Sequence, residues 1–184
     1  MHIHLETPRF IIRDLQREDV EDIFEMDSDP EVHRYLGNKP NKDLQDAHNY
    51  LDLVLKQYAD NGVGRWAVVD KETNEMLGWV GFRLMTEPVN GHVNYYDFGY
   101  RLKRSAWNKG VASEAGLATL LYGINQRGFK PIHAMTDVEN GASRHVLEKL
   151  GFKYVRDFIY DGPMPGWRTD DLRATWYELP ETIG

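Results

Sequence analysis

The sequence of 184 residues contains no cysteine. This absence excludes disulfide bonds, thiolate-bound metal ions and a cysteine nucleophile, and it is compatible with a reducing compartment. No apolar run approaches the roughly 20 residues that cross a bilayer. The first ten residues do not join a basic segment to an apolar one, so no signal peptide is expected either. We therefore predict a cytoplasmic location and no membrane partner.

Acidic side chains outnumber basic ones overall, but one short segment is rich in positive charge. The formal net charge of -7 argues against non-specific nucleic-acid binding as the main activity. It suits a cationic substrate such as an amine, although mild acidity is also common among soluble proteins. Residues 101–109 nevertheless hold four cationic side chains and no acid, which are Arg101, Lys103, Arg104 and Lys109. This local excess predicts a site for an anion.

The apolar pattern predicts one domain over residues 1–184 with a mixed α/β fold. Alternating and β-branched runs predict strands over residues 10–15, 65–70, 75–84, 92–102, 132–138, 153–160 and 171–179. Helical spacing and end signals predict helices over residues 20–26, 28–37, 44–59, 113–126 and 140–151. We expect a mostly antiparallel sheet of about seven strands with helices on both faces and one right-handed strand–helix–strand crossover.

The segment "RSAWNKGVASEAG", residues 104–116, combines a cationic turn with the start of a helix. Main-chain amides at a helix start lack intrahelical acceptors, and the helix dipole adds positive charge there, so phosphate binds well. Asn108 and Gly110 can adopt the positive φ that such a turn needs. The spacing fits neither a P-loop nor a dinucleotide-binding glycine fingerprint. The alternative is a strand–turn–helix junction that binds nothing.

A second motif follows one strand later, in "DVENGASRHVLEKLGF", residues 137–152. Asn140 and Ser143 are three residues apart at a helix start, so both can face the end of the preceding strand. The alternative is helix capping, because Asn and Ser are preferred at helix starts.

Together, "GYRLKRSAWNKGVASEAG" and "NGASRHVLEKLGF" resemble the GNAT superfamily of N-acetyltransferases, especially its Rim-type branch, which acetylates protein amino termini. The opening "LETPRFIIRDLQREDVEDIFEMDSDPEVHRYLG" is similar to the first strand and helices of the same branch. The resemblance spans nearly the whole chain. It implies the GNAT fold, acetyl-CoA as co-substrate and a primary amine as acceptor, either a protein amino terminus or a small molecule. A homodimer is left open.

The resemblance also implies the cofactor contacts. The family's loop pattern falls on Trp107, Gly110 and Ala112, with Trp107 in place of the usual Gln or Arg and Asn108 in place of a frequent Gly. The family pairs the strand before the loop with the pantetheine arm, and it uses the Asn of N-x-x-S near the same arm. The implied cofactor-binding residues are Leu102, Lys103, Arg104, Trp107, Asn108, Lys109, Gly110, Val111, Ala112, Ser113 and Asn140.

The expected reaction is direct attack of the amine on the acetyl carbonyl in a ternary complex, which needs a base, an oxyanion donor and an acid. Many family members place a Tyr at the position of Leu147, so Ser143 is the predicted proton donor to sulfur; the alternative is a capping role only. Asp97 is the predicted base; the alternative is a structural acceptor, with water carrying the proton. By family analogy the amide of Leu102 is the oxyanion donor.

The acceptor side is less constrained. The resemblance places it at the early helices and at the loop of residues 161–167, which predicts Tyr35, Trp79, Phe82 and Trp167 as substrate-binding residues. Core packing is an alternative for Trp79 and Phe82. No metal is expected, because the His residues lack a metal-binding spacing. Two other functions stay open: a catalytically silent GNAT-fold module that binds CoA as a sensor or assembly partner, and a nucleotide binder.

Overall fold

The computed structural model describes residues 2–163 and 172–181. One eight-stranded sheet runs through the molecule in the order β1-β2-β3-β4-β5-β6-β8-β7. The strands are β1 (Ile3–Glu6), β2 (Phe10–Asp14), β3 (Arg65–Asp70), β4 (Met76–Met85), β5 (Tyr95–Leu102), β6 (Ile132–Asp137), β7 (Lys153–Ile159) and β8 (Arg173–Glu178). Only the pair β5–β6 is parallel among these neighbours.

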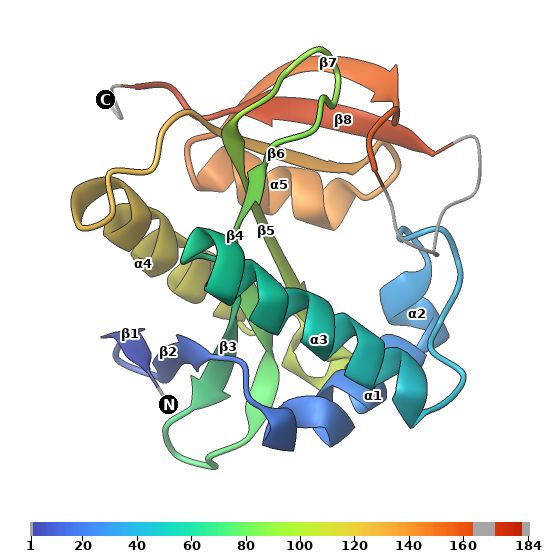
Figure 1. Cartoon of the computed structure of the whole chain (residues 1–184), viewed down its shortest axis with the longest axis vertical. Helices are drawn as coiled ribbons and strands as arrows, with labels where there is room; N and C mark the ends of the chain where they lie inside the picture. The colour runs from blue at the N-terminus through green and yellow to red at the C-terminus, as the bar shows by residue number, and fades with distance from the viewer. Residues whose placement is uncertain (1, 164–171, 182–184) are drawn as a thin grey trace.

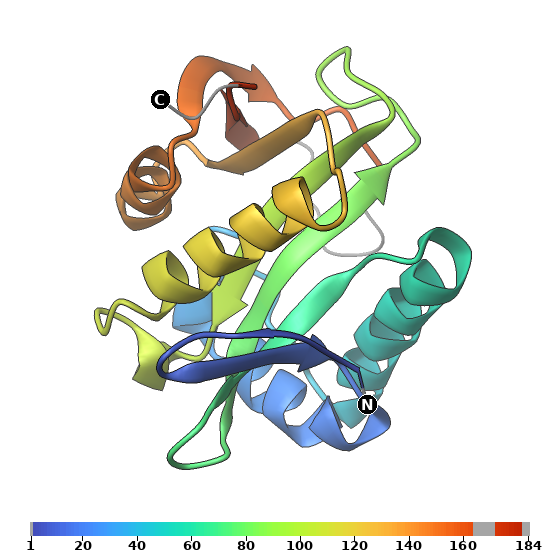
Figure 2. The ribbon, with the colours of Figure 1, turned by 90° about the vertical axis from the view of Figure 1, so that its left-hand side faces the viewer.

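Helices cover both faces of the sheet, as the sequence predicted (Figures 1 and 2). They are α1 (Val20–Ser28), α2 (Pro30–His33), α3 (Leu44–Asn61), α4 (Val111–Asn125) and α5 (Gly141–Lys149), with short 3-10 turns at Arg17–Asp19 and Arg104–Ala106. One core lies under α4 and α5 and includes Phe98, Val111 and Leu147. A second core lies under α1 and α3 and includes Ile23 and Leu51. Among the described residues, no helix is both long and apolar enough to cross a membrane.

Local sequence signals explain where several helices begin and end. The Asp43 carboxylate accepts hydrogen bonds from the amides of Gln45 and Asp46 at the start of α3. Gly62 ends the same helix in the left-handed conformation, with φ of 66°. These caps are short-range, so the sequence shows them before any tertiary contact is known.

β5 and β6 separate after a short paired stretch. Their register covers only Tyr96 to Phe98 against Ile132 to Ala134, although β5 continues to Leu102 and β6 to Asp137. The Lys103 amide donates to the Leu77 carbonyl of β4. Because main-chain groups alternate in direction along a strand, the amides of Tyr100 and Leu102 point away from β4, toward the side on which β6 departs. Beyond Phe98 and Ala134 the two strands therefore diverge and leave a gap that connects the two faces of the sheet.

The structure corrects three details of the predicted fold. β1 is an additional strand, which pairs with β2 and raises the number from about seven to eight. α4 begins at Val111, two residues earlier than predicted. Phe82 belongs to the core: it is fully buried against the rings of Phe98 and Phe129, so the prediction that it binds substrate is wrong.

Candidate active site

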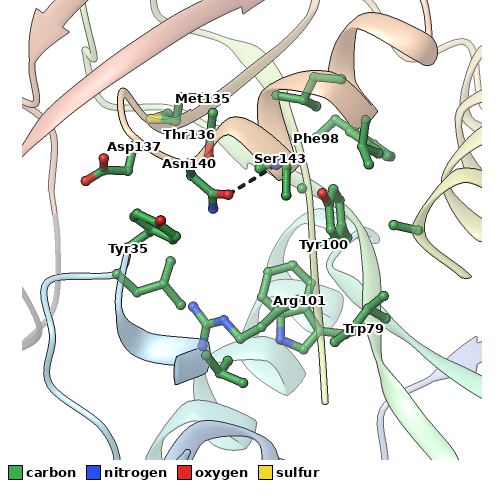
Figure 3. A pocket seen from close by; sticks show the side chains of 18 of the residues that line it. Tyr35, Trp79, Phe98, Tyr100, Arg101, Met135, Thr136, Asp137, Asn140 and Ser143 are labelled. Atoms are coloured by element: carbon green, nitrogen blue, oxygen red, sulfur yellow. Dashed lines mark hydrogen bonds between the residues drawn. The ribbon is translucent and has the colours of Figure 1, made fainter. Parts of the chain in front are cut away.

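A cavity of about 910 Å³ lies where β5 and β6 separate. Its walls come from the carboxyl end of β5, the first turn of α4, the junction of β6 with α5, and helices α2 and α3. Side chains from both faces of β5 reach it, since its lining includes both Tyr100 and Arg101 (Figure 3). This size is typical of sites for small ligands, and the opening in the sheet joins the space under α4 and α5 to the space under α2 and α3.

The first turn of α4 presents unpaired amides to this cavity. The Glu114 amide donates to the Gly110 carbonyl at 3.0 Å, which is the first hydrogen bond of the helix. The amides of Val111, Ala112 and Ser113 precede it and have no intrahelical acceptor, and no side chain caps the helix start. These three residues and Gly110 line the cavity.

The turn before α4 has the backbone conformation that the sequence predicted. Asn108 has φ of 58° and Gly110 has φ of 72°, both in the left-handed region. A Cβ at Gly110 would meet only the Arg9 Nη2 atom, at 3.4 Å. The glycine is therefore needed for its φ and not for lack of space.

Two side chains from the β1–β2 hairpin, Thr7 and Arg9, form hydrogen bonds to this turn and to the first turn of α4. Arg9 donates to the Lys109 carbonyl and to Glu114, and Thr7 donates to the other side of the same carboxylate group. Burial raises the pKa of Glu114, but the hydrogen bonds from Thr7 and Arg9 outweigh it and leave the pKa below its usual value. Glu114 therefore anchors the hairpin to α4 in ionised form.

Leu102 and Lys103, at the end of β5, offer fewer unpaired polar groups to a ligand than the family resemblance implied. The Trp107 indole donates to the Leu102 carbonyl at 3.0 Å, so Leu102 keeps only its amide for a ligand. Lys103 has none: its amide donates to Leu77, its carbonyl accepts from Ala106 and its ammonium pairs with carboxylates of α1. The prediction that Lys103 contacts the cofactor is therefore contradicted, because each of its polar groups has an internal partner.

Two other predicted cofactor residues, Arg104 and Lys109, are exposed and do not line the cavity, so their roles stay predictions about the charge at its rim. The remaining ones all line it: Leu102, Trp107, Asn108, Gly110, Val111, Ala112, Ser113 and Asn140.

Asn140 and Ser143 lie together on the opposite wall. The Asn140 Oδ1 atom accepts from the Ser143 amide at 3.1 Å, so Asn140 does cap α5. Its amide group still points into the cavity (Figure 3), which leaves Nδ2 for a ligand. Capping and ligand contact are thus compatible in this residue.

Tyr100 places a phenol beside Ser143, and the sequence reasoning missed it. Its ring comes from β5 and its hydroxyl lies next to the Ser143 side chain (Figure 3). Burial raises the pKa of the Tyr100 hydroxyl, while the hydrogen bond with Ser143 lowers it; burial dominates. The hydroxyl is therefore protonated at neutral pH. Leu147, where the family often has its Tyr, is buried and also lines the cavity.

The other half of the cavity is aromatic and cationic. Trp79 lies there between two guanidinium groups, those of Arg65 and Arg101, whose carbons are 5.1 and 5.2 Å from its ring centre. The Trp79 Nε1 atom is buried without a partner among the described residues. Tyr35 lines the same half (Figure 3). Trp79 and Tyr35 thus occupy the predicted acceptor side, whereas Trp167 lies outside the described residues.

Two buried ion pairs, Arg101–Asp27 and Arg65–Asp97, fix the side chains in this half of the cavity. Arg101 Nη1 lies 2.8 Å from Asp27 Oδ1, and His33 contacts the same oxygen. Burial raises the pKa of Asp27, but the charge of Arg101 and the hydrogen bond from His33 overcome it and hold the pKa below its ordinary value.

Asp97, the predicted base, pairs with Arg65, which also donates to the Asp97 and Gly81 carbonyls. Because its carboxylate is already paired with Arg65, Asp97 fits the alternative role stated above, that of a structural hydrogen-bond acceptor.

Strand alternation was the signal that could have identified Tyr100 and Arg101. In "YYDFGYRL" successive side chains point to opposite faces, so Tyr100 shares a face with Phe98, and Arg101 shares the other face with Asp97. Which face meets which reactant depends on the separation of β5 from β6, and a single sequence does not show this.

The cavity can therefore hold an anion at one end, a thiol-sized group near Tyr100 and Asn140, and a second reactant beside Trp79. Comparisons with known proteins show the family and the fold. The profile of the acetyltransferase (GNAT) domain matches residues 9–153. The chain is 32% identical over 149 residues to the uncharacterized N-acetyltransferase p20 of Bacillus licheniformis, covering 81% of this chain and 82% of the relative.

Solved structures give the same result. The GNAT-family acetyltransferase from Bacillus anthracis superposes with a TM-score of 0.74 at 25% identity, over 97% of this chain and 98% of that one. The spermidine N-acetyltransferase from Vibrio cholerae in complex with CoA and spermine shares the fold, with a TM-score of 0.71 at 19% identity over 94% and 95% of the two chains. The protein described here belongs to the GNAT acetyltransferase family.

Proposed function

We propose that this protein transfers the acetyl group of acetyl-CoA to a primary amine by direct attack within a ternary complex. The observation that carries the proposal is the open first turn of α4, whose three free amides face a cavity that crosses the sheet. When bound, acetyl-CoA supplies an activated carbonyl and a thiolate leaving group. No covalent enzyme intermediate is needed, which suits a chain without cysteine.

The amides of Val111, Ala112 and Ser113 fit a diphosphate. They are unpaired, they point out of a helix start with a positive dipole, and Gly110 brings the backbone close without a side chain. The amides of Tyr100 and Leu102 lie further along the same wall and can donate to main-chain-like amide groups of the pantetheine arm or to the carbonyl under attack.

Tyr100 is the proton donor to the leaving sulfur, with Ser143 orienting its hydroxyl. The protonated phenol can donate a hydrogen bond to the sulfur as thiolate charge develops, and any proton that passes to sulfur is replaced on the phenol from solvent. Ser143 alone, the donor expected from the sequence, is a much weaker acid than a phenol. The contact between the two hydroxyls allows Ser143 to keep a positioning role.

For the base we favour water over Asp97. The Asp97 carboxylate already pairs with Arg65 in a partly closed environment, so protonating it would break a charge pair. Asp97 and Arg65 together shape the floor beneath the acceptor. The ammonium proton then leaves through solvent in the open part of the cavity.

One side chain of the acceptor half, Arg83, favours an amine that also carries an anionic group. Three guanidinium groups line this half, those of Arg65, Arg83 and Arg101. Arg65 pairs with Asp97 and Arg101 with Asp27, and the carboxylates of Glu31 and Asp137 also line the cavity. Within the described residues, Arg83 forms no ion pair; its Nε contacts the Met85 sulfur. The carboxylate of an amino acid, or an acidic side chain close to a peptide or protein amino terminus, can pair with Arg83, and a polyamine has no such group.

A panel of acceptors tests the proposal by release of the CoA thiol. We expect turnover with amino-acid or peptide amines above that with spermidine, and a loss of about 10²–10⁴-fold in kcat for Tyr100→Phe. Ser143→Ala should cost less than Tyr100→Phe. Arg83→Gln should raise KM for the anionic acceptor and leave KM for acetyl-CoA unchanged, with exposed Arg34→Gln as the matched control. A chain that binds CoA but acetylates no amine would instead support the silent module.

A further inference from the structure

Three side chains with metal-binding atoms meet at a place away from the cavity. His92 comes from the loop between β4 and β5, His133 from β6 and Glu178 from β8, and none of them lines the cavity. His133 and Glu178 are directly opposite each other in the β6–β8 register. The three potential ligand atoms all lie within 4.8 Å of one another. In Figure 1 this loop rises beside β7 and β8 at the top of the molecule.

His133 has a buried nitrogen without a partner. The side chain is only 7% exposed, and its Nδ1 atom is buried with no hydrogen bond among the described residues. The nearest carboxylate oxygen, Glu178 Oε1, is 3.9 Å away, too far for a hydrogen bond. Buried polar atoms are normally paired, so an unpaired nitrogen facing a carboxylate indicates a missing ligand.

The other two side chains are positioned to complete the site. His92 Nε2 also lies 3.9 Å from Glu178 Oε1. The His92 ring stacks on Trp176 with centroids 4.8 Å apart, and the Trp176 indole donates to Glu178 Oε1. Such outer contacts orient ligands in metal sites.

We propose that His92, His133 and Glu178 bind a divalent transition-metal ion, with Zn²⁺ the best match. Two imidazoles and one carboxylate form a common zinc ligand set, and they suit Mg²⁺ or Ca²⁺ poorly because those ions prefer oxygen ligands. Tetrahedral Zn²⁺ with bonds of about 2.0–2.1 Å sets its ligands about 3.4 Å apart. The two 3.9 Å separations to Glu178 need to shorten by about half an ångström, and the largest separation, at most 4.8 Å, by up to about 1.4 Å. The side chains of His92 and Glu178 are 38% and 41% exposed and can make these movements.

The ion would tie together segments far apart in sequence. His92 lies in the connection between β4 and β5, His133 lies in β6, and Glu178 ends β8. The loop at His92 covers a small core that includes Val89, Tyr95 and Trp176. An ion that binds only the folded state raises thermal stability. The site therefore stabilises this end of the sheet and takes no part in acetyl transfer.

The test uses the untagged full chain, stripped with a chelator and titrated with Zn²⁺ by calorimetry. We expect one equivalent at micromolar affinity or tighter, together with a higher Tm. Co²⁺ should give visible absorption bands typical of nitrogen and oxygen ligands and should quench the fluorescence of Trp176, a signal that Trp176→Phe removes. Mg²⁺ should have no effect at the same concentration.

Variants locate the ion. His92→Ala and Glu178→Gln change half-exposed side chains that a folded protein tolerates, and each should weaken Zn²⁺ binding at least tenfold. His48→Ala on α3 is the control and should leave binding unchanged. Absence of Zn²⁺ binding to the wild-type chain, or an equivalent that persists at equal affinity in both His92→Ala and Glu178→Gln, would overturn the proposal.

Discussion

A negative charge in the first turn of α4 should weaken acetyl-CoA binding while it stabilises the fold. Ser113 is the third residue of α4, is half-buried and lines the cavity. Ser113→Asp places a carboxylate among the amides that we assign to the diphosphate. Ser113→Asn has nearly the same shape without the charge, so it is the matched control.

The size of the effect follows from Coulomb's law. A charge in the first turn lies about 6 Å from an anion held by the amides of the same turn, given a rise of about 1.5 Å per residue. Repulsion at that distance is about 0.7 kcal/mol in bulk water and about 2.8 kcal/mol at an effective dielectric constant of 20. These energies correspond to about 3-fold and about 100-fold in affinity. The same carboxylate gains about 0.3–1 kcal/mol from the helix dipole.

The assay is steady-state kinetics with varied acetyl-CoA, combined with thermal unfolding without ligand. We expect KM for acetyl-CoA to rise about 3- to 100-fold in Ser113→Asp relative to Ser113→Asn, and the ratio to shrink at high salt. Tm should be equal or higher in Ser113→Asp. Equal KM values for the two variants would show that the diphosphate does not bind at this turn.

Three further changes test other contacts. Phe82→Ala removes a fully buried ring and should cost about 3–5 kcal/mol of unfolding free energy in denaturant titrations, without changing KM for either substrate; a selective rise in acceptor KM would restore its substrate role. Asn140→Asp keeps the cap on α5 but replaces Nδ2, so stability should hold while acetyl-CoA affinity falls severalfold; unchanged affinity would leave Asn140 as a cap alone. Asp27→Asn breaks the pair with Arg101 and should cost about 3–5 kcal/mol near pH 6. Since the folded pKa of Asp27 is lowered, its contribution is present above the usual value of 3.8 and is lost as pH falls through the folded pKa, so the stability difference between wild type and variant should shrink at acid pH. A difference that stays constant down to pH 2 would contradict the cause given for this shift.

Local features of the site were predictable because they depend on neighbouring residues only. The positive φ of Asn108 and Gly110 follows from their tolerance of the left-handed region. The cap by Asn140 follows from its place before a helical run. The alternation of strand residues and the helix ends gave most of the sheet and all five helices in order.

Features that depend on register or on distant segments were not predictable. Lys103 looks like a phosphate ligand in a basic segment, yet it packs inward against carboxylates of α1, about 80 residues earlier in the chain. Phe82 and Trp79 differ only in which side of β4 they occupy, and the sequence does not say which side holds the acceptor. His92, His133 and Glu178 have no recognisable metal spacing, since strand pairing brings His133 to Glu178 and the fold of the β4–β5 loop adds His92.

The separation of β5 from β6 also assigns the two proposed reactants to two parts of the chain. In the proposed reaction, residues 104–149 form the wall for the coenzyme, and α2 and α3, within residues 30–61, form much of the wall for the amine. The two reactants would then approach from opposite faces of one sheet and meet at its opening. Substitutions in α2 and α3 can therefore change which amine binds without changing the residues that bind the coenzyme. Proteins with this fold can then acetylate different amines and keep the same acyl donor.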